Sequence, residues 1–141
     1  MRVMAFMMGN QDSESGRIPD PEEFLEMGRF NEELVKAGVL LAGEGLHPTK
    51  DSAKLKWTGD GPTVIDGPFT EAKEVIAGFW IVEVASLDEA KEWFQRCPGG
   101  EGMEIQLRPI YELDEFGDSL TPEVRDLNEY LRLGQERNAT S

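Results

Sequence analysis

The chain is poor in cysteine, histidine and basic residues. Its 141 residues include one cysteine and one histidine, and 14 lysines and arginines stand against 28 aspartates and glutamates. A single cysteine excludes an intramolecular disulfide, and Cys97, before Pro98 at an expected helix end, is interpreted as a packed thiol rather than a nucleophile. A net charge of −14 without any basic block argues against nucleic-acid binding, because lysine and arginine normally neutralise phosphates.

Long apolar runs are also missing. No segment approaches the roughly 18 apolar residues of a membrane span. The apolar start of the chain, residues 1–8, is too short for a signal peptide and lacks a small-residue cleavage site. The acidic residues are spread along the chain, as on a soluble surface. We therefore expect a cytoplasmic protein without membrane association.

Metal and nucleotide motifs are absent from the sequence. One histidine, one cysteine and scattered acids have no zinc-like spacing, and no EF-hand loop occurs. Gly43 and Gly45 are not followed by the third glycine and the helix of a dinucleotide-binding loop. Gly99, Gly100 and Gly102 lie between an expected helix and an expected strand, which is the wrong context for such a loop. We expect no metal and no cofactor.

Apolar periodicity and turn residues predict an alternation of strands and helices. One helix is expected to begin at Pro21 with Asp20 as its N-cap, and another follows a capping box of Ser86 and Glu89. Residues 9–19 are predicted to be a loop and 135–141 to be frayed. Strands are expected at residues 2–8, 39–44, 53–58, 63–65, 78–84 and 103–107, and helices at 21–37, 87–97 and 121–133.

This order is β-α-β, a β-hairpin, then β-α-β. Without the hairpin it is the split β-α-β pattern of a ferredoxin-like α+β domain, an antiparallel sheet with helices on one face. The other face must be covered, and one chain of 141 residues can cover it only in part. The sequence therefore predicts a homodimer.

Residues 66–74 are the most distinctive segment of the chain and lie between two apolar runs typical of strands. Asp66-Gly67-Pro68 favours a turn, since glycine tolerates positive φ and proline fixes its own φ. A bare turn needs neither Phe69 nor the charged residues Glu71 and Lys73 behind it. The segment is either a strand connection with an aromatic plug and a solvated charge run, or part of a functional site.

Residues 66–74, with 37–46 before them and 90–98 after them, closely resemble the signature and flanks of the DGPF proteins, a branch of the YCII-related family. The resemblance covers about residues 1–111 and leaves 112–141 as a C-terminal helical extension. It implies a ferredoxin-like βαββαβ fold with an inserted hairpin, in which two copies pair as a dimeric α+β barrel. Relatives found beside extracytoplasmic-function sigma factors imply a regulatory role.

Asp66 and His47 are the candidate catalytic residues. Asp66 lies at a strand end beside a stiff Gly-Pro backbone, where it either borders a pocket or accepts hydrogen bonds from its own turn. The pKa of a free histidine suits proton transfer at neutral pH, and Asp66 or Glu44 would orient His47. Some YCII relatives are thought to use a His–Asp pair, but their histidine belongs to another segment, so His47 does not inherit that role by position.

Further candidates would bind a ligand. Four of them also have a structural interpretation: a solvated charge for Glu71 and Lys73, a buried plug for Phe69, and a strand-surface salt bridge for Arg108. The candidate ligand-binding residues are Glu44, Phe69, Glu71, Lys73 and Arg108.

Three functions remain open from the sequence. The first is a binding protein that holds a small molecule in a barrel or sheet-face pocket, in a regulatory role. The alternative is a small-molecule enzyme, a lyase, isomerase or hydrolase, that uses Asp66 with His47 or Glu44 for proton transfer. The third is a structural homodimer whose signature motif serves the interface. Binding is favoured over catalysis, since no catalytic constellation is complete.

Overall fold

The computed structural model of the chain describes residues 1–69 and 74–140. The chain divides into two compact units, Met1–Ile110 and Tyr111–Ser141.

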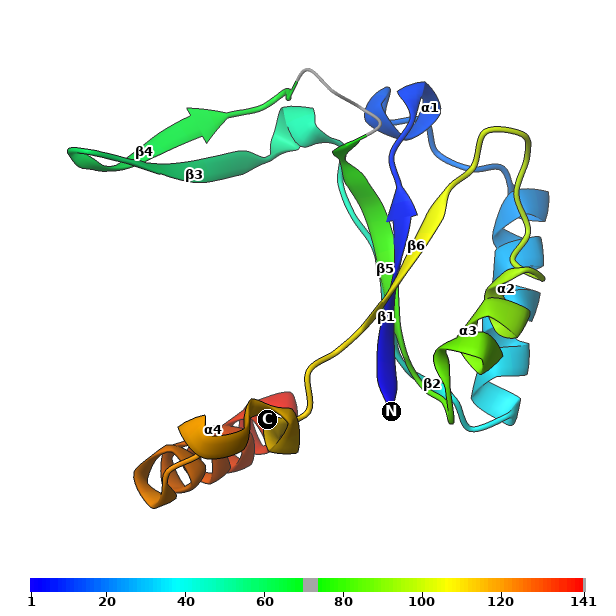
Figure 1. Cartoon of the computed structure of the whole chain (residues 1–141). Helices are drawn as coiled ribbons and strands as arrows, with labels where there is room; N and C mark the ends of the chain where they lie inside the picture. Colours follow the sequence, from blue (N-terminus) through cyan, green and yellow to red (C-terminus); the bar gives the residue numbers. More distant parts are fainter. Residues whose placement is uncertain (70–73, 141) are drawn as a thin grey trace. The chain divides into compact units, whose positions relative to one another are not determined.

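The first unit is built on a four-stranded antiparallel sheet with the strand order β2-β5-β1-β6. With the hairpin set aside, this is the ferredoxin-like order, so the predicted fold class is confirmed. The hairpin β3-β4 forms a separate two-stranded sheet (Figure 1). Along the chain it is inserted between β2 and β5, which themselves pair in the main sheet. The elements are β1 (Arg2–Met8), α1 (Gln11–Glu14), α2 (Pro21–Lys36), β2 (Leu40–Gly45), the 3-10 helix η1 (Thr49–Asp51), β3 (Ala53–Thr58), β4 (Gly61–Asp66), β5 (Ile76–Glu83), α3 (Leu87–Phe94) and β6 (Ile105–Pro109).

The two long helices begin where local chemistry predicts. The Asp20 carboxylate accepts a hydrogen bond of 2.9 Å from the backbone N–H of Glu23, and Pro21 occupies the first turn of α2. At α3, the Ser86 hydroxyl accepts a bond of 3.1 Å from the backbone N–H of Glu89. These caps satisfy backbone donors that a helix start leaves unpaired.

An aromatic cluster holds both helices to the same face of the sheet (Figure 1). Phe30 of α2 meets Trp80 of β5 edge to face, with ring centroids 6.2 Å apart. Phe94 of α3 lies 5.2 Å from the Trp80 ring and 5.8 Å from the Phe30 ring. Such tilted aromatic pairs contribute about 0.5–1.5 kcal/mol beyond the area they bury.

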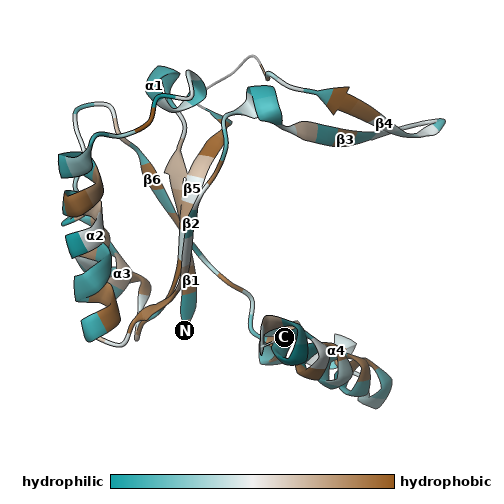
Figure 2. Cartoon of the chain, turned by 180° about the vertical axis from the view of Figure 1, so that it is seen from behind, coloured by the Kyte–Doolittle hydropathy of each residue, from teal (hydrophilic) through white to brown (hydrophobic). Residues whose placement is uncertain are grey.

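Side-chain alternation divides the sheet into a covered and an open face. Trp80 is buried on the helix side, as are Val3, Ala5 and Val82. The residues between them along each strand point to the open face. There Met4 lies opposite Ile81 and Phe6 opposite Phe79, and all four are partly exposed. Figure 2 shows hydrophobic residues along β5. The middle of this face is apolar, and among the described residues of the first unit no helix lies over it.

The turn of the signature packs tightly against η1. The Gly67 N–H donates to the carbonyl oxygen of Ser52 at 2.8 Å, and a Cβ at position 67 would lie 1.6 Å from the carbonyl oxygen of Thr49. The backbone N–H of Phe69 donates to the Thr49 hydroxyl oxygen at 3.0 Å. Only glycine fits at position 67, because any side chain would overlap the η1 backbone.

A buried hydroxyl joins this turn to the start of the chain. Thr49 is 5% exposed and its hydroxyl donates to the carboxylate of Glu14 in α1, which also accepts a bond of 3.1 Å from the Thr49 N–H. Residues 9–19 were predicted to be a loop, which is wrong for α1. Asn10 caps this one turn by accepting from the Ser13 N–H at 2.9 Å, and so short a helix carries no apolar periodicity.

The second unit consists of η3 (Leu113–Ser119) and α4 (Pro122–Thr140). Thr121 caps α4, since its hydroxyl oxygen accepts from the Val124 N–H at 3.3 Å. The prediction that residues 135–141 are frayed is wrong up to Thr140, because α4 continues through them. Ion pairs of Arg132 with Glu129 and Glu136 support this part of the helix.

In residues 1–69 and 74–140, no helix combines the length and the apolar character that crossing a membrane requires.

We expect Gly67→Ala to lower the free energy of unfolding by about 3 kcal/mol, because the new methyl group must displace the η1 backbone. Gly59→Ala is the matched control, since a Cβ at position 59 meets no atom within 4 Å. Urea unfolding of both variants measures the difference. Equal unfolding midpoints for the two variants would contradict the tight contact.

Candidate functional site

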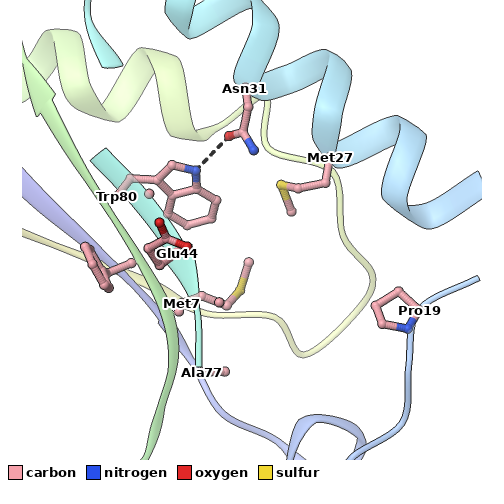
Figure 3. A pocket seen from close by; sticks show the side chains of 11 residues that line it. Met7, Pro19, Met27, Asn31, Glu44, Ala77 and Trp80 are labelled. Atoms are coloured by element: carbon pink, nitrogen blue, oxygen red, sulfur yellow. Dashed lines mark hydrogen bonds between the residues drawn. The ribbon is translucent and has the colours of Figure 1, made fainter. Parts of the chain in front are cut away.

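A cavity of about 390 Å³ lies between α2 and the strands β2 and β5. Its lining combines thioether, aromatic and backbone surface with a small number of polar groups (Figure 3). The lining residues are Met7, Pro19, Met27, Asn31, Gly43, Glu44, Gly45, Ala77, Gly78, Phe79 and Trp80. A mostly apolar concavity with few polar groups is typical of a small-molecule site.

Glycines in the paired strands make room for this cavity. Gly43 lies opposite Trp80 and Gly45 opposite Gly78. A Cβ at Gly43 would lie 3.2 Å from Cδ1 of Trp80, which places both glycines of β2 on the helix side by alternation. A Cβ at Gly45 meets no atom within 4 Å, so that position faces open space.

The fixed polar feature of the cavity is a bond between Trp80 and Asn31. The indole Nε1–H donates to Oδ1 of Asn31 at 2.8 Å, and Trp80 is only 6% exposed. Asn31 lies on the face of α2 that also presents Met27, four residues earlier, and Leu34, three residues later. Figure 3 shows Trp80, Asn31 and Met27 around the same space.

Glu44 is the sequence-predicted residue that the structure places at this cavity. It is exposed and lies opposite Phe79 in the β2-β5 pair. Because side chains alternate along a strand, its carboxylate leaves β2 on the side opposite to Gly43. Glu44 therefore forms the rim of the cavity on the edge strand.

His47 has a carboxylate partner that the sequence analysis did not name. Its Nδ1 lies 3.1 Å from Oδ2 of Asp51, and its side chain is 84% exposed. The residue that orients the ring is thus Asp51, rather than Glu44 or Asp66. The spacing of four residues across the η1 turn is the signal that would have indicated this pair.

Other predicted residues lie apart from the cavity. Asp66 ends β4 opposite Ala53 and is exposed, and it is not among the lining residues. Phe69 is partly buried, with Nζ of Lys54 4.4 Å from its ring centroid. Arg108 is exposed on β6 opposite Met4, on the open face of the sheet.

Glu71 and Lys73, also predicted as ligand-binding residues, fall outside the described residues. Among the described residues, Glu44 alone of the predicted set lines the cavity. Trp80 and Asn31 were missed as site residues. The sequence did contain a signal for Asn31, because it lies at helical spacing between the apolar residues Met27 and Leu34. An amide on an apolar helix face needs a hydrogen-bond partner, which would have indicated a polar contact there.

Cys97 has the properties of a packed thiol. Burial raises the pKa of its thiol to about 11, because the thiolate loses hydration there. The group is therefore protonated at neutral pH and is a poor nucleophile. Within the described part of the chain, no group of three or more histidine, cysteine or acidic residues is placed to hold a metal ion.

An uncharacterised protein, R00369, of Rhizobium meliloti (strain 1021) is 35% identical over 101 residues, which are 69% of this chain and 82% of that protein. Among solved structures, 5-chloro-2-hydroxyhydroquinone dehydrochlorinase (TftG) from Burkholderia phenoliruptrix AC1100, in complex with 2,5-dihydroxybenzoquinone, is 15% identical with a TM-score of 0.40. That match covers 84% of this chain and 100% of that one. The family model of the YCII-related domain matches residues 1–114, and the chain belongs to this family.

Proposed function

We propose that this YCII-related chain binds a small, largely apolar molecule in the cavity beneath α2. The observation that carries the proposal is a cavity of about 390 Å³ whose apolar lining holds one fixed polar pair, Trp80 and Asn31. Pockets for small ligands usually enclose about 300–1,000 Å³ and use a few placed polar groups for orientation. The lining matches this pattern.

The glycines of β2 support the proposal further. Glycine weakens a strand, by roughly 0.5–1 kcal/mol relative to alanine in the interior, and β2 contains Gly43 and ends at Gly45. A Cβ at Gly45 would meet nothing within 4 Å, so close packing does not require glycine there. The space it leaves is available to a ligand.

We also propose that two copies pair through the open face of the sheet as a dimeric α+β barrel. The support is the partly exposed apolar set Met4, Phe6, Phe79 and Ile81, which no helix of the first unit covers. A contiguous apolar face of this kind is unfavourable in water. A second copy presents the same face and buries both.

We expect Gly45→Leu to abolish binding in the cavity while keeping the fold, because the leucine side chain enters open space. A thermal-shift screen of small uncharged aromatic compounds measures this. A compound at about 100 times its Kd stabilises the protein by about 2.7 kcal/mol. Compounds that bind in the cavity should raise the Tm of the natural chain and should leave the Tm of the Gly45→Leu variant unchanged.

The matched control for this screen is Gly28→Leu on the exposed side of α2, where a Cβ also meets no atom within 4 Å. This control should keep every hit. Binding that survives in Gly45→Leu, or a screen without hits, would contradict the proposed cavity.

We expect size-exclusion chromatography with light scattering to give a mass of twice the 15.8 kDa chain at micromolar concentration. Phe6→Glu on the open face should shift the mass to that of one chain, since a carboxylate is costly to bury there. Gln95→Glu adds the same charge at an exposed position at the end of α3, on the covered side of the sheet, and should leave the dimer intact in dilute salt. A natural chain that elutes as a monomer overturns the barrel pairing.

A second candidate function is proton-transfer catalysis on a small molecule, with Asp66 and His47 or Glu44 as the acid–base groups. The observation that favours it is the 3.1 Å contact of His47 Nδ1 with Asp51, which leaves Nε2 of the exposed ring to exchange protons. Imidazole is the side chain that enzymes use most often as a general acid or base.

If the chain is an enzyme of this kind, it converts one of the compounds tested. We then expect His47→Gln and Asp66→Asn each to lower kcat for that compound by about 100-fold or more. Asp60→Asn, at an exposed position of the hairpin turn, is the control that should keep full activity. Product analysis by NMR measures turnover. Unchanged kcat in both variants would exclude these residues from catalysis.

A further inference from the structure

The orientation of the Asn31 amide is determined by its neighbour. An indole N–H can only donate, so the atom of Asn31 that lies 2.8 Å from Nε1 of Trp80 must be the oxygen Oδ1. The amide is planar, and its nitrogen Nδ2 therefore points away from the indole. Figure 3 shows this nitrogen on the side of Met27.

The amide nitrogen is a hydrogen-bond donor at the wall of the cavity. Within the part of the chain that the structure describes, the bond to Trp80 is the hydrogen bond that the Asn31 side chain makes. Asn31 is partly buried and lines the cavity. No described side-chain nitrogen is both buried and unpaired, so Nδ2 is open to water. A ligand that displaces this water without an oxygen to accept from Nδ2 would leave the donor unpaired, which costs free energy, so an acceptor oxygen is favoured.

The charge around the cavity selects the type of acceptor. None of the described lining residues is lysine, arginine or histidine, and the one ionisable residue among them is Glu44. The chain as a whole carries a net charge of −14. A carboxylate or phosphate ligand would meet repulsion without a cation to pair with, so the acceptor is an uncharged oxygen.

The walls of the cavity indicate the body of the ligand. Met7 and Met27 contribute two thioether side chains, and Trp80 contributes a ring. Methionine sulfur contacts aromatic rings favourably, and its flexible chain adapts to a flat edge. These surfaces fit an aromatic ring system better than a branched aliphatic one.

We infer that the cavity is specific for an uncharged aromatic carbonyl compound whose oxygen accepts a hydrogen bond from Nδ2 of Asn31. The aromatic part contacts Met7, Met27 and Trp80. This inference rests on the proposed binding function and adds the chemical class of the ligand. Trp80 acts as a positioning residue, because it holds the amide in the orientation that presents its donor.

The test uses three probes of the same ring: 2-acetylnaphthalene, 2-ethylnaphthalene and 2-naphthoate. Isothermal titration calorimetry gives each Kd, and the indole N–H resonance of Trp80 reports that binding occurs in the cavity. We expect 2-acetylnaphthalene to bind about fivefold more tightly than 2-ethylnaphthalene, as one neutral hydrogen bond allows. The anionic 2-naphthoate should bind most weakly.

Asn31→Asp tests the donor directly. An aspartate still accepts from the indole of Trp80 but has no N–H for a ligand, so the fivefold preference should disappear. Asn128→Asp in α4 adds the same charge outside the cavity and should keep the preference. If Asn31→Asp does not fold, Trp80→Phe serves instead: the amide loses its fixed orientation, and the preference should fall below about twofold.

The outcomes separate the two proposals. If both neutral probes shift the Trp80 resonance with equal Kd, the cavity binds ligands and the carbonyl inference is overturned. The inference is also overturned if 2-naphthoate binds most tightly, or if Asn31→Asp keeps the preference. If no probe binds or shifts Trp80, the proposed binding function itself is overturned.

Discussion

The burial of one indole ring sets most of the geometry of the first unit. Trp80 lies between Phe30 of α2 and Phe94 of α3, and these contacts hold both helices on one face of the sheet. Its N–H must find an acceptor when buried, and Asn31 of α2 supplies one. Its ring also occupies the space beside β2, where a Cβ at Gly43 would lie 3.2 Å away. Core, polar pair and cavity wall therefore follow from the same side chain.

The signature segment has a structural role that its exposed position in the hairpin connection does not suggest. Gly67 packs against the carbonyl of Thr49, and the backbone of Phe69 is held by the hydroxyl of the same threonine. Glu14 completes the arrangement from α1. Three segments that are distant along the chain thus meet at one buried hydroxyl. Membership of the DGPF branch within the YCII-related family stays a prediction from the residues of this segment.

The sequence predicted features that depend on neighbours in the chain. The caps at Asp20 and Ser86, the hairpin and the ferredoxin-like order follow from local turn chemistry and periodicity, and the structure contains them. The one-turn helix α1 was missed because four residues show no period. The extent of α4 was missed because ion pairs, rather than apolar residues, support its last turns.

The candidate site was harder to predict because its polar pair spans 49 positions of the chain. Asn31 and Trp80 each look unremarkable in their own segments, and only the packing of α2 on β5 brings them together. Residues at strand ends and in the signature were predicted as site residues, and of the described ones Glu44 lines the cavity. The partner of His47 lay within one turn of it, at Asp51, but η1 was not predicted.

The cavity also has a consequence for how the chain can change over evolutionary time. It exists partly because Gly45 has no side chain, and a larger residue there would strengthen the strand and meet no obstacle. Selection for stability alone would therefore fill the cavity by a single substitution. Under the proposed function, the glycine at this position gives up some stability for ligand space, and replacing it offers a simple route to a stable protein without a binding cavity.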